Sequence, residues 1–154
     1  MRHCRVLSVS RALLYGTLAV GILDALDAIV VFGLRSGATP LRIFQGIAAG
    51  LYGRASYDGG WRTAAIGVCL HFTIACGITA VYLLASRRWP TLARRPWMFG
   101  PLYGVGVYAV MTLVVIPLSA IGPVRPSAFA LTNGLIIHML GVGLPAALVA
   151  ARTR

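Results

Sequence analysis

Residues 12–34 read ALLYGTLAVGILDALDAIVVFGL, an apolar run interrupted by two aspartates, Asp24 and Asp27. A helix needs about 20 mainly apolar residues to cross a hydrocarbon core of about 30 Å, so this run is long enough for one membrane span. Ionisable side chains inside a span are costly and usually face the interior of a helix bundle. The stretch therefore predicts a membrane fold and its most informative polar site.

Three further stretches of the sequence have the same length and apolar character. They cover residues 63–86, 97–121 and 127–150. A short connector with two prolines separates the last two, which makes them antiparallel neighbours. We therefore predict an all-α membrane protein, a single integral domain over residues 1–154 that folds as a four-helix transmembrane bundle.

The composition excludes an ordinary soluble domain. Of 154 residues, 58% are hydrophobic and 11% are charged, whereas soluble domains carry about 25% charged residues. The mean hydropathy is +0.83. The sequence contains no dinucleotide fingerprint, phosphate-binding loop, nucleophile elbow or zinc-ligand spacing, so we predict that the protein is not an enzyme.

The segment between the first two spans differs from them. Thr39 followed by Pro40 has the order of a helix start, and the following LRIFQGIAAGLYG places apolar residues at helical spacing. A helix over residues 40–53 would be about 21 Å long, which is too short to cross. We expect an interfacial helix here, with a re-entrant segment as the alternative.

The basic residues are arginines throughout, fourteen against three acids, for a net charge of +11. Because no soluble basic module is present, we exclude nucleic acid as a partner and interpret the arginines as residues at membrane edges. With the N-terminus inside, nine arginines are cytoplasmic and five are outside, which the positive-inside rule favours. The inside set is Arg2, Arg5, Arg11, Arg87, Arg88, Arg94, Arg95, Arg152 and Arg154. The outside set is Arg35, Arg42, Arg54, Arg62 and Arg125.

This distribution predicts a bacterial cytoplasmic (inner) membrane protein with both termini in the cytoplasm. The lipid bilayer is then its principal partner, and guanidinium groups near the short helix can bind lipid phosphates. Tryptophans at span ends are typical interface anchors. The predicted interface residues are Arg35, Arg42, Arg54, Arg62, Trp61, Trp89 and Trp97.

The N-terminus and the cysteines add little. MRHCR followed by an apolar run has features of a signal peptide, but no cleavage site closes the run and no lipobox precedes Cys4, so we expect no processing. Cys69 and Cys76 lie on one helix face about 10 Å apart along its axis, which is too far for a disulfide.

Four ionisable side chains fall inside the predicted spans: Asp24, Asp27, His71 and His138. Counting residues from each span centre places all four in one layer, from the membrane midplane to slightly outside it. The two aspartates project from nearly the same helix face. Since both cannot remain charged cheaply at low dielectric, we expect a proton or a cation to compensate one of them.

Three interpretations of this layer remain open. Asp–His hydrogen bonds can hold the bundle together. The same groups can handle protons or ions, since Asp and His form relays within membranes. Two histidines on separate helices can also ligate a haem iron or a transition metal, although no attachment motif is present and no cofactor is the expected state.

Other features predict details of packing. Glycines four residues apart permit close helix approach. These pairs are Gly46 with Gly50 and Gly100 with Gly104. Pro117 and Pro145 are expected to kink the third and fourth spans, and Asn133 can donate to a neighbouring helix.

Several short motifs follow one another in the second half of the sequence. They are GVCLHF at residues 67–72, AVY at 80–82, the basic loop to Trp89-Pro90, the glycine-rich start of the third span, Ile116-Pro117-Leu118, and His138. In these motifs the chain resembles the YagU-like family of small bacterial inner-membrane proteins. The resemblance implies a multi-span protein with a histidine in each of two helices, no established catalytic role, and a place in membrane or acid-stress physiology. It extends to His71, Pro117 and His138.

The leading functional hypothesis is a non-enzymatic membrane protein whose Asp/His layer organises the bundle and handles protons or ions. One alternative is an accessory or structural subunit of a larger membrane complex, or a homo-oligomer. The other is a haem- or metal-binding bundle, with His71 and His138 as the ligands.

Overall fold

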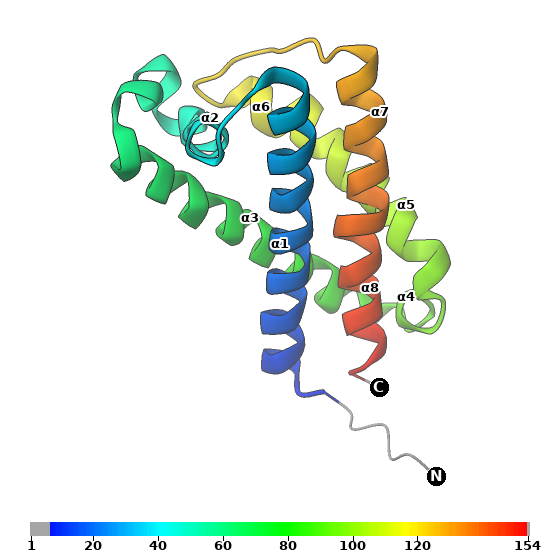
Figure 1. The fold of residues 1–154 in the computed structure, drawn as a ribbon. Coiled ribbons are helices and arrows are strands. Elements are labelled where there is room, and N and C mark those ends of the chain that lie inside the picture. The colour runs from blue at the N-terminus through cyan, green and yellow to red at the C-terminus, as the bar shows by residue number, and fades with distance from the viewer. Residues whose placement is uncertain (1–6, 154) are drawn as a thin grey trace.

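The computed structural model describes residues 7–153, and their secondary structure is helical throughout (Figure 1). Within this range four helical segments are long and apolar enough to cross a membrane. They are Val9–Ser36, Gly60–Arg88, Pro96–Leu118 and Ala128–Ala151. The predicted all-helical, four-span architecture is confirmed at this level. Cys4, Arg2, Arg5 and Arg154 lie outside the described residues.

The first span is the single helix α1, Val9–Ser36. The Ser8 side chain accepts a hydrogen bond from the backbone N–H of Arg11 and caps its start. Gly37 ends the helix in the left-handed conformation, with φ of 66°, which favours glycine. The helix exceeds the predicted 12–34 at both ends because these caps lie outside the apolar run.

The short helix α2, Pro40–Tyr52, begins where the Thr39-Pro40 pair predicts. Thr39 caps it by accepting from the backbone N–H of Arg42, and a 3₁₀ segment η1, Gly53–Asp58, follows. The helix packs mainly against α3, Gly60–Arg88. At the crossing, Gly67 has no room for a Cβ, which would meet the carbonyl oxygen of Phe44.

The last two spans are each built from several segments. After α4, Thr91–Arg94, the third span comprises α5, Pro96–Val110, the π-helical η2, Met111–Val115, and α6, Ile116–Leu118. The fourth comprises α7, Ala128–Ile137, the π-helical η3, His138–Gly143, and α8, Leu144–Ala151. The third helix stops at Leu118 and not at the predicted residue 121, because Ser119 has an extended backbone.

Pro117 and Pro145 each lie two residues after the end of a π-helical segment. Proline has no N–H to donate, and its ring clashes with the carbonyl oxygen four residues earlier. A wider turn relieves that clash, and π-helical turns are common at irregular, functional places in helices. The irregularity predicted at both prolines therefore takes this form.

Glycine packing is as predicted for one pair and not for the other. A Cβ on Gly104 would meet the carbonyl oxygen of His138, so α5 and η3 lie backbone to backbone. By contrast, a Cβ on Gly46 or Gly50 would meet only ordinary neighbours, Tyr57 Oη at 3.4 Å and Ser119 Cβ at 3.8 Å. The expectation for that second pair is wrong, because the close contact of α2 is made at Gly67.

The described chain is most tightly packed at the end of the bundle that contains α8. Alanines with no exposed surface, Ala12, Ala146 and Ala150, pack with Val20 and Val142. The backbone N–H of Leu7 donates to the carbonyl of Arg152 at 2.8 Å, which joins the two ends of the described chain. At the opposite end α3 runs obliquely away from α1, and α2 lies across the space between them (Figure 1). We refer to these as the α8 end and the α2 end.

Candidate functional site

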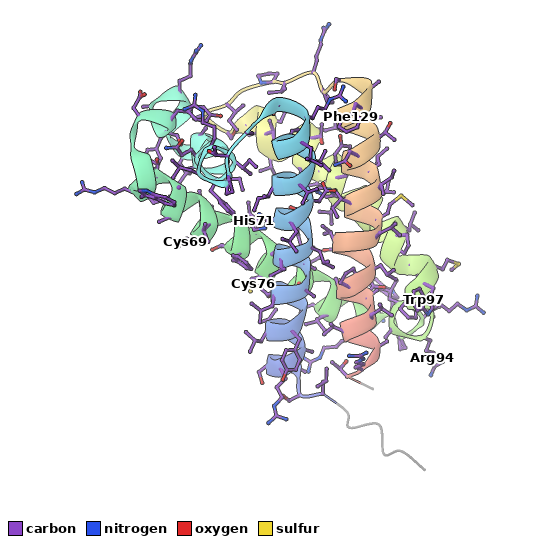
Figure 2. All side chains as sticks on the ribbon, in the orientation of Figure 1. Cys69, His71, Cys76, Arg94, Trp97 and Phe129 are labelled. Atoms are coloured by element: carbon purple, nitrogen blue, oxygen red, sulfur yellow. The ribbon has the colours of Figure 1, made fainter. Side chains whose placement is uncertain are left out.

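The first polar contact in the bundle joins α1 to α3. His71 is nine-tenths buried, and its Nε2 lies 2.8 Å from the carbonyl oxygen of Gly21. Its Nδ1 faces the Asp24 carboxylate at 4.0 Å. The imidazole is set edge-on between two aromatic rings, with centroids 6.2 Å away for Phe44 and 5.4 Å for Phe72. Figure 2 places His71 behind α1, at the middle of the bundle.

The surroundings of His71 fix its chemistry. A carbonyl oxygen only accepts, so Nε2 carries a proton and donates it to Gly21. Nδ1 is then either the acceptor of a neutral ring or the second donor of an imidazolium. At 4.0 Å the contact with Asp24 is electrostatic and too long for a direct hydrogen bond.

The second polar contact joins α1 to α7. Asn133 Nδ2 donates to Asp27 Oδ2 at 2.8 Å. This confirms the expectation that Asn133 donates to a neighbouring helix. It also gives Asp27 a neutral partner, whereas Asp24, one turn along the same helix, faces an ionisable one.

His138 differs from His71 in what its nitrogens contact. Its Nδ1 donates to Gly134 of its own helix at 2.9 Å, and its ring packs edge-on against Tyr108 with centroids 5.2 Å apart. Within residues 7–153, its Nε2 has no hydrogen-bond partner. Asp24 interacts electrostatically with His138, His71 and Asp27 and is therefore the centre of the group.

Two connected cavities contain the four predicted residues. The small cavity, about 220 Å³, is lined by Asp24, His71 and His138. The large cavity, about 840 Å³, is lined by Asp24, His138 and Asp27 with its partner Asn133. Since Asp24 and His138 line both, the cavities adjoin at these two side chains. The structure thus brings together the four residues that the sequence predicts to share one layer, and all four line these cavities.

The large cavity extends towards one end of the bundle only. Ser36, Ala38 and Arg42 line it, and these residues belong to the last turn of α1, the connector and the first turn of α2. In the other direction the small cavity ends at Val20 and Val142, which belong to the tightly packed core. Access to Asp24 is therefore from the α2 end.

Most of the predicted interface residues lie outside this cavity. Trp61, Trp89 and Trp97 are 78%, 60% and 71% exposed, as membrane-interface anchors are expected to be. Arg54 and Arg62 are exposed as well. Trp97 projects near Arg94 at the α8 end, far from Phe129 near the start of α7 (Figure 2).

Two arginines at the α2 end stack on aromatic rings. Arg35 lies over the Phe129 ring, 4.0 Å from its centroid, and Arg42 lies over Tyr57 at 4.2 Å. Arg42 and Tyr57 also line the large cavity, a role that the sequence did not indicate. Tyr108 lines both cavities, which the sequence did not indicate either.

A metal site is not formed by the side chains in residues 7–153, where no group of three or more His, Cys or acidic residues is close enough to hold an ion. His71 is a poor haem ligand as well, since its Nε2 donates to Gly21 and its Nδ1 faces Asp24. Of the cysteines described, Cys69 and Cys76 are free thiols.

Comparisons with protein-family models, with curated proteins and with solved structures find no match to this chain. The class of protein is therefore defined by its fold and site, which are those of a four-helix membrane bundle with an acidic, histidine-containing cavity that opens at one end.

Proposed function

We propose that the protein takes up and releases protons at the Asp/His group, reached through the cavity from one side of the membrane. The observation that carries this proposal is the continuity of the two cavities from Arg42 at the α2 end to Asp24. Buried carboxylates and histidines along a solvated path are the usual elements of intramembrane proton relays. The role is binding and transfer of protons and is not enzymatic.

The charge balance favours protons as the exchangeable species. Asp24 and Asp27 lie on one face of α1, so their charges repel at low dielectric. An imidazolium at His71 would compensate one of them, since its Nδ1 faces Asp24 at 4.0 Å. Asn133 donates a hydrogen bond to Asp27 but carries no charge. One negative charge is thus left for a proton, or another cation, to neutralise.

The proposed topology follows from the arginines. Among the described residues, the α2 end includes five arginines and the α8 end six. Those at the α2 end are Arg35, Arg42, Arg54, Arg62 and Arg125, and those at the α8 end are Arg11, Arg87, Arg88, Arg94, Arg95 and Arg152. We place the α8 end and both termini in the cytoplasm of a bacterial inner membrane, with α2 at the outer interface. The cavity then opens outwards, which agrees with the acid-related physiology that the YagU-like resemblance implies.

Infrared titration of the purified protein tests this proposal. A carboxyl band that appears as the pH falls, and that is lost in Asp24→Asn or Asp27→Asn, is the expected result. The matched control is Asp58→Asn, because Asp58 is the third acid in the chain and is exposed at the end of η1. A band with the same intensity in Asp24→Asn, in Asp27→Asn and in the unchanged protein would exclude the proposed site.

An accessory-subunit role is the second candidate, supported by a separate feature. An apolar groove of about 700 Å³ runs between α3 and α5. Gly77 and Gly106 are exposed on its two sides, and a Cβ added to either would have no neighbouring atom within 4 Å. Small residues on lipid-facing surfaces allow close approach of another helix. Co-purification with a fixed partner after mild solubilisation would favour this role.

A further inference from the structure

We propose that the joined cavities bind an organic ammonium ion with an apolar or aromatic body, in exchange for a proton at Asp24 and Asp27. This inference rests on the proposed proton site and names its second ligand. It is argued from the size, the walls and the charges of the cavities.

The cavities are larger than proton handling requires. A water molecule occupies about 30 Å³ of liquid, so a proton path needs only a narrow file of waters. The volume of the large cavity, about 840 Å³, instead falls in the range of small-molecule sites, about 300–1,000 Å³. The cavity can therefore hold a ligand of several carbon atoms.

The cavity walls are mainly apolar and aromatic. Apolar walls with few convergent polar groups are typical of sites for organic ligands and not for hydrated ions. The Tyr108 ring lies at the junction of the two cavities, beside His138, where it can face a bound cation. The remaining apolar and aromatic residues of the large cavity include Phe32, Ile43, Ile47, Tyr57, Ile116 and Ile137.

The charges that line the large cavity favour a cationic ligand and determine how it is oriented when bound. The inner part of the large cavity has two carboxylates, Asp24 and Asp27, and its mouth has the guanidinium of Arg42. An ammonium group that carries three donors suits the inner carboxylates. Because the guanidinium at the mouth repels an ammonium group, the bound ligand is expected to place its ammonium innermost, next to Asp24. Its apolar body then lies near the rim.

Proton exchange follows because the proton and the ammonium compensate the same negative charge. Asp24 is faced by Asp27 from its own helix, by His71 from α3 and by His138 from η3. Tyr108 from α5, Arg42 from α2 and Tyr57 from η1 complete the ionisable groups that line the cavities. As the pH rises the aspartates lose protons, so we expect ammonium binding to strengthen with pH and to release protons.

Calorimetric titration of the full chain in detergent tests the inference with three probes. These are 2-phenylethylammonium, its neutral analogue 2-phenylethanol, and sodium ion. We expect saturable binding of the ammonium only, with proton release that is revealed by buffers of different ionisation enthalpy. Asp24→Asn or Asp27→Asn should weaken binding about tenfold or more, as loss of a partly buried charge partner does. Asp58→Asn should leave the affinity within about twofold.

The outcomes separate this inference from the proton proposal. Equal binding of 2-phenylethanol or of sodium would overturn the ligand class. A carboxyl band that titrates normally, with no ammonium binding, would overturn the inference and leave the proton site in place. Ammonium binding that depends on both aspartates without proton release would support the ligand and contradict the proton site. If Asp24→Asn does not fold, Asp24→Glu keeps the charge and should retain binding.

Discussion

The two ends of the bundle are built on opposite principles. At the α8 end, small side chains such as Ala12, Ala146 and Ala150 have no exposed surface, and the helices contact one another closely. At the α2 end, α3 diverges and α2 crosses between the spans, yet about 840 Å³ stays open. Dense packing of small residues stabilises membrane bundles, whereas enclosed polar space does not.

This difference indicates what each end does. The α8 end holds the four spans in one arrangement. The α2 end keeps Asp24 and Asp27 accessible from the large cavity. Packing and the proposed function thus belong to separate parts of the same helices, and substitutions at the two ends should have different consequences.

The largest expected effect is at a close backbone contact between α5 and η3. A methyl group in Gly104→Ala would meet the carbonyl oxygen of His138, which is backbone and cannot move aside. We expect the free energy of unfolding to fall by about 3 kcal/mol or more, as for severe overpacking. Circular dichroism during denaturation in mixed micelles measures it.

Gly106→Ala is the matched control, two residues along the same helix. The added methyl group would have no atom within 4 Å, so stability should change by less than about 1 kcal/mol. Equal destabilisation by Gly104→Ala and Gly106→Ala would mean that α5 and η3 do not make the close contact.

The second prediction compares the two histidines. His71→Ala removes a hydrogen bond to another helix and leaves a hole between Phe44 and Phe72, so we expect a loss of about 2 kcal/mol. His138→Ala removes a bond within its own helix from a half-buried ring and should cost about 1 kcal/mol or less. Unfolding in mixed micelles again provides the measurement. A larger loss for His138→Ala would contradict the expectation that the bond from His71 to Gly21 stabilises the bundle more than the bond within the fourth span.

The third prediction concerns the contact between α1 and α7. Asn133→Ala removes the donor to Asp27, and hydrogen bonds between membrane helices average about 0.6 kcal/mol in double-mutant cycles. A cycle with Asp27→Ala, which removes the acceptor, should return a coupling energy of that size. The control pair is Asn133 with Asp58, which lies in η1, and its coupling should be zero within error.

Much of the bundle was predictable because spans are set by local composition. A run of about 20 apolar residues has few alternatives to a membrane helix, and Thr39-Pro40 marks the start of α2 by local capping. That Asp24 and His71 meet at one level of the bundle also follows from counting along regular helices. These features depend on short stretches of chain.

The cavity could not be predicted, because it depends on how the helices cross. The sequence around Arg42 does not indicate that α2 lines the same cavity as Asp27. The error at Gly46 has the same origin, since a glycine pair permits close packing but does not choose the partner helix. The position of α2 relative to helices distant in the sequence follows only from the complete fold.

The smallest expected effect distinguishes the two arginines that stack on rings at the α2 end. Arg35→Gln and Arg42→Gln each remove a partly exposed cation–π contact, so each should lower the free energy of unfolding by about 0.5–1 kcal/mol. Only Arg42 lines the large cavity. Arg42→Gln should therefore raise the affinity for 2-phenylethylammonium about twofold at low salt, because a positive charge leaves the entrance. The gain should vanish near 1 M salt, where the Debye length is about 3 Å. An equal gain in Arg35→Gln would mean that the total charge of the α2 end acts on the ligand, and that the mouth of the cavity has no special position.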